Sequence, residues 1–224
     1  MWSNVVILLE NVWKEYRTGT NRVAALRGVN IRILEGQYVC ITGPNGSGKT
    51  TLLKIIAGML KADRGNVRVL GGDPFSDPKV KSLVGLMPQE DVLFDTLSIE
   101  EHLELLSYID KGLDQDYITG LITRYGLADM LNRRPFQLSG GQRRLVQLVL
   151  VLARKPKVLL LDEPTAFLDT ENTSMVLNFI RRLYNEEKIT VIVSTHDELI
   201  CSDADTIIHL RNGVIVKQET GIPA

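Results

Sequence analysis

The chain has 224 residues, of which 44% are hydrophobic and 24% charged, and its formal net charge is −1. These values are ordinary for a globular protein and exclude an overall field that would favour nucleic acid or an anionic membrane. No apolar run reaches the roughly 18–20 residues that a membrane-spanning helix needs, and the start lacks the basic head of a signal peptide. If the protein acts at a membrane, we expect another chain to provide the spanning part.

Cys40 and Cys201 are the two cysteines of the sequence. Cys40 lies in a predicted buried strand and Cys201 lies close to two aspartates, a pattern that does not suggest a disulfide framework. We therefore expect no disulfide, which fits a reducing compartment.

Strands dominate the first part of the chain, where short apolar or alternating runs are separated by glycine, proline and asparagine. The strands expected here are 5–9, 26–34, 38–42, 67–70 and 83–87, with turns at 18–21 and 63–66 and a helix at 51–59.

The pattern becomes helical between about residues 98 and 131. Ser98 is a predicted N-cap, and Glu101 completes a capping box. No strand is expected in this segment, which predicts a helical insertion at about 90–137.

Helices and strands alternate in the last part of the chain, which predicts a mostly parallel sheet. We expect helices at 141–154 and 172–184 and strands at 158–161, 190–194, 206–210 and 214–217. The predicted fold is α/β, with a mostly parallel central sheet, an antiparallel β part near the N-terminus and the helical insertion. It forms one domain, residues 1–224, with a core lobe (1–89 and 138–224) and a helical lobe (about 90–137).

A glycine-rich segment after the strand at 38–42 fits the pattern G-x-x-x-x-G-K-[ST] of a phosphate-binding loop. Glycines let the backbone turn and aim its N–H groups at phosphate oxygens, and the following helix adds its positive dipole end. Lys49 provides a charge for the outer phosphates, and the Thr50 hydroxyl suits magnesium. The alternative, a turn that binds nothing, does not explain the flanking strand and helix. The expected phosphate-binding residues are Gly43, Pro44, Asn45, Gly46, Ser47, Gly48, Lys49, Thr50 and Thr51.

Asp162 and Glu163 follow the apolar strand at 158–161. Ligands in open α/β sheets bind beyond the carboxyl ends of the strands, where the phosphate loop also lies. We expect Asp162 to hold magnesium through water beside Thr50, and Glu163 to orient or deprotonate an attacking water. This division suits phosphoryl transfer. The alternative is that both acids merely end a strand.

Residues 138–142 read Leu-Ser-Gly-Gly-Gln at the start of an apolar helix. A serine hydroxyl, two glycine N–H groups and a helix N-terminus make a second anion cradle. With the phosphate loop upstream and the Asp-Glu strand downstream, this pentad resembles the signature of ABC transporter nucleotide-binding subunits, and the resemblance covers nearly the whole chain. It implies a P-loop NTPase fold that binds ATP and Mg²⁺ and forms a head-to-tail dimer. In that dimer Ser139, Gly140, Gly141 and Gln142 face the ATP of the other subunit.

The resemblance assigns roles to further residues. Tyr16 resembles the aromatic residue that stacks on adenine, with Trp13 as a rival. Gln89 resembles the glutamine that contacts magnesium and joins the lobes, so that the expected metal site is Thr50, Gln89 and Asp162. Asp169 resembles the residue at the dimer contact, and His196 resembles the histidine that contacts the γ-phosphate. The expected catalytic residues are Glu163, His196 and Lys49.

The sequence departs from the family pattern in the helix after the signature. As we align it, Leu145 and Leu150 occupy positions where relatives usually carry arginine, which affects the positioning of the signature rather than nucleotide binding. His102 and His209 are interpreted as structural histidines.

The family resemblance implies an ATP-hydrolysing subunit that closes as a homodimer, or with a related subunit, and drives separate transmembrane permease subunits. The contact surface for the permease is expected near residues 92–99, and the location is cytoplasmic, on the inner face of the membrane. No nucleic acid partner is expected. The segments 23–29 and 206–213 resemble the lipoprotein-release and macrolide-efflux branch, whereas 87–90 also resembles drug exporters.

Two alternatives stay open at the level of sequence. One is a soluble ABC ATPase that acts on ribosomes or DNA, although such proteins usually carry two ATPase domains or a long insert. The other is an ATP-gated regulatory scaffold that binds a membrane protein without moving a substrate.

Overall fold

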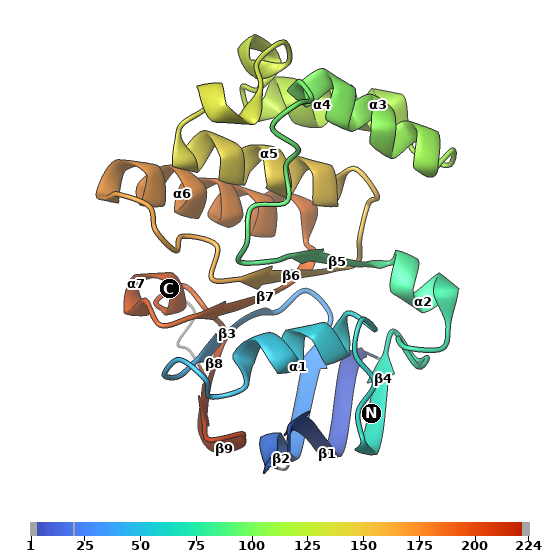
Figure 1. Cartoon of the computed structure of the whole chain (residues 1–224), viewed down its shortest axis with the longest axis vertical. Coiled ribbons are helices and arrows are strands. Elements are labelled where there is room, and N and C mark those ends of the chain that lie inside the picture. The colour runs from blue at the N-terminus through green and yellow to red at the C-terminus, as the bar shows by residue number, and fades with distance from the viewer. Residues whose placement is uncertain (1–3, 20, 221–224) are drawn as a thin grey trace.

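The computed structural model describes residues 4–19 and 21–220. Its elements form layers that are visible in Figure 1. A six-stranded sheet crosses the middle of the molecule, with α1 and a three-stranded sheet on one side and α5 and α6 on the other. Helices α3 and α4 lie outside α5. Both the α/β class and the antiparallel part near the N-terminus are as predicted.

The three-stranded sheet has the order β2-β1-β4 and is antiparallel throughout. Its strands are β1 (Val5–Thr18), β2 (Asn21–Leu34) and β4 (Arg64–Val69). β1 and β2 are much longer than the sequence predicted, because they continue pairing up to the hairpin turn expected at 18–21. Thr20 in that turn lies outside the described residues.

The six-stranded sheet has the order β5-β6-β7-β3-β8-β9, and its strands are parallel except for the β8–β9 pair. The sequence predicted all six strands, with small differences in their ends. Their bounds are β3 Tyr38–Thr42, β5 Val84–Met87, β6 Val158–Asp162, β7 Thr190–Thr195, β8 Thr206–Arg211 and β9 Val214–Thr220.

The described helices include the segments expected after the phosphate loop, in the insertion and after the signature. The capping box predicted at Ser98 and Glu101 is present at the start of α3. In chain order the helices are α1 Lys49–Ile56, α2 Pro78–Ser82, α3 Ile99–Ile109, α4 Gln115–Arg124, α5 Gly140–Leu152, α6 Thr170–Glu187 and α7 Glu198–Cys201, with short 3₁₀ turns at Ala128–Met130 and Pro135–Gln137.

Both faces of the central strands β3, β6 and β7 of the six-stranded sheet are buried, which explains why these strands are almost wholly apolar. In β6, Leu159 and Leu161 pack on the side of α5 and α6, whereas Val158 and Leu160 pack towards α1. The alternation of side chains along a strand therefore supplies two separate cores from one run of apolar residues. This double packing fixes the strand ends from which the site is built.

The turn predicted at 63–66 is wrong beyond its first residue. Strand β4 begins at Arg64, which pairs with Trp13, and continues through Asn66, which pairs with Glu10. Pairing with β1 overrides the local preference of glycine and asparagine for turns, because strand formation depends more on neighbours than on intrinsic propensity. Helices α2 and α7 were not predicted, because segments this short carry little periodicity.

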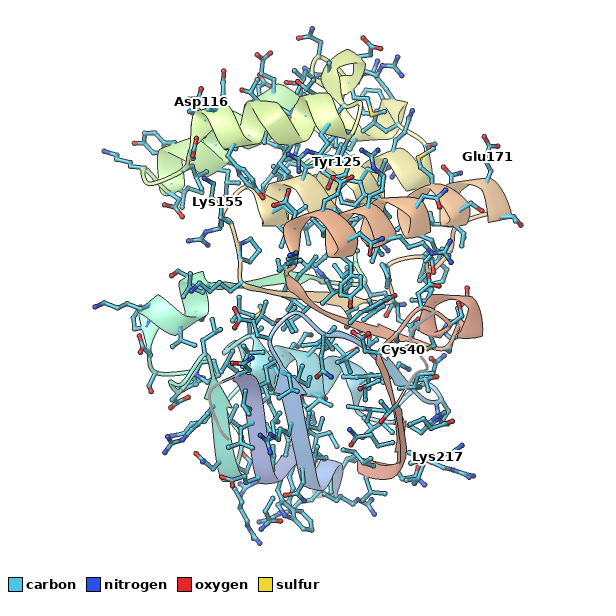
Figure 2. The ribbon with its side chains drawn as sticks, turned by 180° about the vertical axis from the view of Figure 1, so that it is seen from behind. Cys40, Asp116, Tyr125, Lys155, Glu171 and Lys217 are labelled. Carbon is cyan, nitrogen blue, oxygen red and sulfur yellow. A yellow bond between two sulfur atoms is a disulfide. The ribbon has the colours of Figure 1, made fainter. Side chains whose placement is uncertain are left out.

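The prediction that the cysteines stay unpaired is also wrong, because Cys40 and Cys201 form a disulfide. Their Cα atoms lie 5.3 Å apart although 161 positions separate them in sequence. They meet because α7 follows β7 closely and β7 pairs with β3. Figure 2 labels Cys40 at the level of the six-stranded sheet. Sequence spacing alone carried no sign of this contact.

Within the described ranges, none of the helices combines the length and the apolar character that crossing a bilayer requires.

Candidate nucleotide site

Four neighbouring parallel strands deliver the predicted site residues to one edge of the sheet. Gln89 follows β5, Glu163 follows β6, His196 follows β7 and the phosphate loop follows β3. Since these strands are adjacent in the order β5-β6-β7-β3, their carboxyl ends meet at the same edge. Residues that are far apart in the chain thus come together, as expected for ligand binding in a parallel sheet.

The phosphate loop needs glycine at its first position. Gly43 has a φ of +154°, and a Cβ atom there would lie 2.0 Å from the carbonyl oxygen of Leu210. Behind the loop, the Ser47 carbonyl accepts a hydrogen bond from the Gly213 N–H at 2.9 Å. The backbone is therefore held in a shape that leaves the N–H groups at the start of α1 available for an anion.

Ser47 carries a buried hydroxyl with no hydrogen-bond partner among the described residues. Buried polar atoms nearly always have a partner, so an orphan of this kind needs an explanation. A phosphate oxygen in the loop would provide an acceptor for this hydroxyl, which fits the chemistry that the sequence predicts here.

Lys49 is buried at the first turn of α1. Its Nζ donates to the carbonyl oxygen of Gly43 at 2.8 Å and lies 3.3 Å from Oε1 of Glu163. Both side chains of this ion pair are almost inaccessible to water. A buried pair of this kind compensates two charges that would be costly alone, and a phosphate group arriving in the loop offers Lys49 an alternative anion.

Glu163 bridges Lys49 and His196. Its Oε2 lies 2.9 Å from Nδ1 of His196, whereas its Oε1 faces Lys49. The residue has a φ of 47°, and its N–H donates to the Ser194 carbonyl at 2.9 Å. The left-handed backbone turns the carboxylate away from the strand direction and towards the phosphate loop. His196 itself is largely exposed, with 66% of its side chain accessible.

Asp162 is buried one residue before Glu163, and its carboxylate accepts a hydrogen bond from the Ser194 hydroxyl. The sequence did not identify Ser194 as part of the site, although it precedes the predicted histidine segment. Among the described residues there is no group of three or more His, Cys, Asp or Glu side chains placed to hold a metal. Thr50, Gln89 and Asp162 supply oxygen donors only, a set that suits Mg²⁺ when phosphate oxygens complete its shell.

A cavity of about 420 Å³ lies in front of the phosphate loop. Its size is within the usual range for small-ligand sites. Besides the loop it brings in Gln89 from the end of β5 and Glu163 from the end of β6. The residues lining it are Ala25, Asn45, Gly46, Ser47, Gly48, Lys49, Thr50, Thr51, Gln89 and Glu163.

Tyr16 lies beside this cavity, because its hydroxyl is 3.4 Å from Oγ1 of Thr51 and its side chain is partly exposed. Trp13, the rival aromatic residue, instead donates its indole N–H to Asn11 at 2.9 Å and lies close to Gly28. The geometry therefore places Tyr16, rather than Trp13, next to the phosphate loop.

The signature pentad lies at the N-terminus of α5, where Ser139 is the exposed N-cap. The Ser139 hydroxyl accepts from the Gln142 N–H at 3.2 Å and donates to Oδ1 of Asn172 at 2.9 Å. Asn172 also accepts from the Gly141 N–H at 3.1 Å. A Cβ atom on Gly141 would lie 2.4 Å from that same Asn172 oxygen, so only glycine permits this contact. None of the four residues 139–142 belongs to the described lining of the cavity.

Asp169 caps α6 and accepts two hydrogen bonds from Asn172, from its N–H at 2.8 Å and from its side-chain amide at 2.7 Å. These two bonds hold the pKa of the Asp169 carboxyl below its usual value. Asn172 thus ties the signature to Asp169, a link that the sequence did not predict. Its place three residues after an aspartate N-cap was the available signal.

The two histidines interpreted as structural have ordinary partners. His102 is buried, accepts from the Phe94 N–H at 2.8 Å through Nε2 and therefore donates through Nδ1 to the Ser98 carbonyl at 2.7 Å. His209 pairs with Glu219 across β8 and β9 at 2.7 Å.

Comparison with known proteins agrees with this geometry. The family model described as "ABC transporter" matches residues 26–166, more than half of the chain. An uncharacterized ABC transporter ATP-binding protein of Methanocaldococcus jannaschii is 37% identical over 95% of this chain and 98% of its own length. The macrolide export ATP-binding/permease protein MacB of Syntrophobacter fumaroxidans is 34% identical over 94% of this chain and 31% of its own length.

Several of the matched curated relatives are longer proteins, and the chain spans less than half of their length. Among solved structures, the ATP-binding cassette MJ0796, in a dimeric post-hydrolysis state bound to ADP and Pi, superimposes with a TM-score of 0.86. It is 31% identical and covers 97% of this chain and 100% of the solved chain.

The relatives, MacB among them, are consistent with the macrolide-efflux and lipoprotein-release branch. The fold, the cavity in front of the phosphate loop and these relatives lead to one conclusion: the chain belongs to the ABC transporter family and is an ATP-binding cassette, a P-loop ATPase.

Proposed function

We propose that the chain is the ATP-hydrolysing subunit of a transporter and that two copies, or one copy and a related subunit, close around two Mg-ATP. The observation that carries this proposal is the separation of two anion cradles. One surrounds the cavity at Lys49, and the other, at Ser139, is exposed and lies outside that cavity. Two cradles of which only one borders the cavity are explained if each serves the nucleotide of a different copy.

Binding of ATP begins with an exchange of partners. The γ-phosphate takes the place of the Glu163 carboxylate as the anion next to Lys49, whose Nζ is 3.3 Å from that carboxylate in the free chain. Thr50, Asp162 and Gln89 would hold magnesium, which when bound supplies positive charge that offsets the charge of the phosphates. Tyr16 stacks on the adenine ring from its position beside Thr51.

Hydrolysis follows from the release of Glu163. Once Lys49 faces the phosphates, the Glu163 carboxylate orients a water molecule and accepts its proton as the oxygen attacks the γ-phosphorus and the bond to ADP breaks. His196, 2.9 Å from Glu163, keeps the carboxylate in place and contacts the γ-phosphate in the closed dimer. The products are ADP and phosphate, and their release reopens the pair.

Coupling to transport is assigned to the helical lobe, about residues 90–137, which moves against the core lobe formed by 1–89 and 138–224. ATP favours the closed dimer, so its binding energy drives that movement. The exposed side chains of Val92 and Phe94 offer an apolar contact for a permease at the inner face of the membrane. The relative MacB, named as both ATP-binding and permease protein, supports such a pairing.

The test is ATP hydrolysis by the purified chain, measured as phosphate release with and without EDTA, together with its mass in solution. We expect hydrolysis that requires a divalent cation and an ATP-dependent dimer. ATP binding without hydrolysis or dimer formation, in a chain with an intact fold, would contradict the proposal and favour a regulatory scaffold.

A further inference from the structure

Helix α5 buries a charged side chain at an unexpected position. Leu145, which stands where relatives usually carry arginine, is buried in the core between α5 and the sheet. The preceding residue, Arg144, is also buried, with 7% of its surface exposed, and so is Gln147 at 1%. These two polar residues are three positions apart and therefore lie on the same side of the helix.

Both side chains bind the segment that follows β5. Arg144 donates through Nη1 to the Pro88 carbonyl at 3.3 Å and through Nη2 to the Gln89 carbonyl. Gln147 accepts from the same Nη1 at 3.1 Å and donates through Nε2 to the Asp91 carboxylate at 2.7 Å. This set of three residues, Arg144, Gln147 and Asp91, is called the α5 clamp below.

The segment held by the α5 clamp has no regular structure of its own. It lies between the end of β5 at Met87 and the start of α3 at Ile99. Asp91 strengthens it locally by accepting from the Leu93 N–H at 3.0 Å, and Arg143 lies 3.5 Å from the same carboxylate. Backbone carbonyls in such a segment need hydrogen-bond donors, and Arg144 donates to two of these carbonyls.

A buried arginine is a costly way to hold a loop. Burial lowers the pKa of the Arg144 guanidinium, and the nearby carboxylates of Asp91 and Glu90 oppose that effect. Apolar side chains of similar volume often give equal or greater stability than a buried charge network. The network is better explained by the orientation it imposes, since a satisfied set of directed hydrogen bonds selects one arrangement of helix and loop.

The same helix carries the signature. Ser139 caps α5, and Arg144 lies five residues later, about 7.5 Å along the helix axis. On its other side Arg144 contacts the carbonyl of Gln89, a residue that lines the cavity together with Glu163. Any displacement of the rigid first turns of α5 therefore acts on the signature and on the backbone of Gln89 together.

We propose that Arg144 is a positioning residue: with Gln147 and Asp91 it fixes the Gln89 segment against α5, so that the orientation of the signature helix sets the position of Gln89 in the phosphate cavity. This inference rests on the proposed function of the chain. The side chain of Arg144 touches neither nucleotide nor water in this scheme and acts through the Gln89 backbone alone.

The direct test is amide hydrogen exchange in the segment 88–95 of the nucleotide-free chain, which does not depend on ATPase activity. In Arg144→Met we expect exchange in this segment to accelerate at least about tenfold, because hydrogen bonds from a charged group are lost. The Arg144→Lys variant should restore part of the protection. The control is Arg154→Met, which removes an exposed arginine paired with Asp110 at 2.8 Å and should leave the segment unchanged.

Kinetics separate positioning from general stability. We expect Arg144→Met to lower kcat at least about tenfold while the Kd for ATP stays within about twofold, because Gln89 is misplaced but the phosphate loop is intact. Unchanged exchange and unchanged kcat in the folded variant would overturn the proposal. Loss of ATP binding to the same extent as kcat would also overturn it, since that result indicates a structural role.

Hydrogen exchange also decides the question if the wild type is inactive or if Arg144→Met does not fold. If the wild-type chain hydrolyses no ATP, the proposed function fails, but exchange in 88–95 still decides whether the clamp holds the segment. If Arg144→Met does not fold, Asp91→Asn keeps the side-chain shape and weakens the contact with Gln147. Faster exchange in Asp91→Asn would then support the clamp, and wild-type exchange would overturn it.

Discussion

The phosphate loop and the signature share one kind of anion-binding chemistry, but the phosphate loop has more of the groups that a nucleotide needs. Each places glycine N–H groups and a hydroxyl at the N-terminus of a helix, α1 in one case and α5 in the other. The phosphate loop adds Lys49, Glu163 and a cavity, and its Ser47 hydroxyl has no partner among the described residues. At the signature, Ser139 is exposed and already bonded to Asn172.

We propose that this difference reflects one site that is complete within the chain and another that is half of a site shared between two copies. A loop with its own lysine and cavity can bind a triphosphate alone, whereas an exposed cradle outside that cavity needs a second molecule to enclose the ligand. Variants that change one of the two cradles at a time should therefore separate ATP binding, dimer closure and hydrolysis.

The largest effect is expected at the residue that connects binding to chemistry. Glu163→Gln should lower ATP hydrolysis at least about 100-fold, because the amide cannot accept the proton of the attacking water. ATP binding should persist, and the dimer should accumulate in the ATP-bound state. Phosphate release and light scattering measure the two effects. Glu171→Gln, which changes an exposed acid on α6 labelled in Figure 2, is the control.

A variant of Glu163 that hydrolyses ATP normally and stays monomeric with ATP would refute this assignment of the base. It would also remove the reason to regard the Lys49–Glu163 pair as a contact that ATP replaces.

The signature is tested by blocking the exposed N-terminus of α5 with a bulky side chain. Ser139→Arg should prevent ATP-dependent dimer formation and lower hydrolysis at least about tenfold, because a long charged side chain blocks the exposed N-terminus of α5. Binding of ATP to the monomer should match the wild type by calorimetry. Ser82→Arg, an exposed serine on α2, provides the matched control. Loss of monomer binding in Ser139→Arg would count against a site shared between copies.

The phosphate loop is tested by removing the positive charge of Lys49. Lys49→Ala should weaken ATP binding at least about tenfold, because a charge-assisted contact with the outer phosphates is lost. Isothermal calorimetry measures the change in Kd, with Lys54→Ala on the same helix as control. An unchanged Kd would contradict the phosphate-binding role, and hydrolysis would then have to be explained without this loop.

The smallest effect is expected at the edge of the cavity. Tyr16→Ala should raise the Kd for ATP about 2- to 12-fold through the loss of aromatic stacking, and Tyr16→Phe should bind almost as the wild type does. Fluorescence titration with an adenine nucleotide measures both variants. If Trp13→Ala weakens binding more than Tyr16→Ala in folded protein, the rival aromatic residue has the role.

The sequence predicted the phosphate loop better than it predicted the contacts around the signature. The phosphate loop and the ends of β3 follow from a contiguous pattern, and the capping box at Ser98 follows from residues three positions apart. These features depend on local chemistry, so a short window of sequence contains them.

The links around the signature depend on contacts between distant segments. Asn172 reaches Ser139 across 33 positions, and Arg144 reaches Gln89 across 55. The disulfide between Cys40 and Cys201 is a third case, and the β4 strand at Arg64 is a fourth. No local propensity encodes such pairs, because they exist only after the sheet has brought its strands together.

A crystal structure of Glu163→Gln with Mg-ATP tests the central claim most directly. The account predicts two copies in head-to-tail contact, each γ-phosphate lying between Lys49 of one copy and the Ser139 hydroxyl of the other. It is contradicted if the nucleotide contacts one chain alone while Ser139 keeps its hydrogen bond to Asn172 and faces solvent.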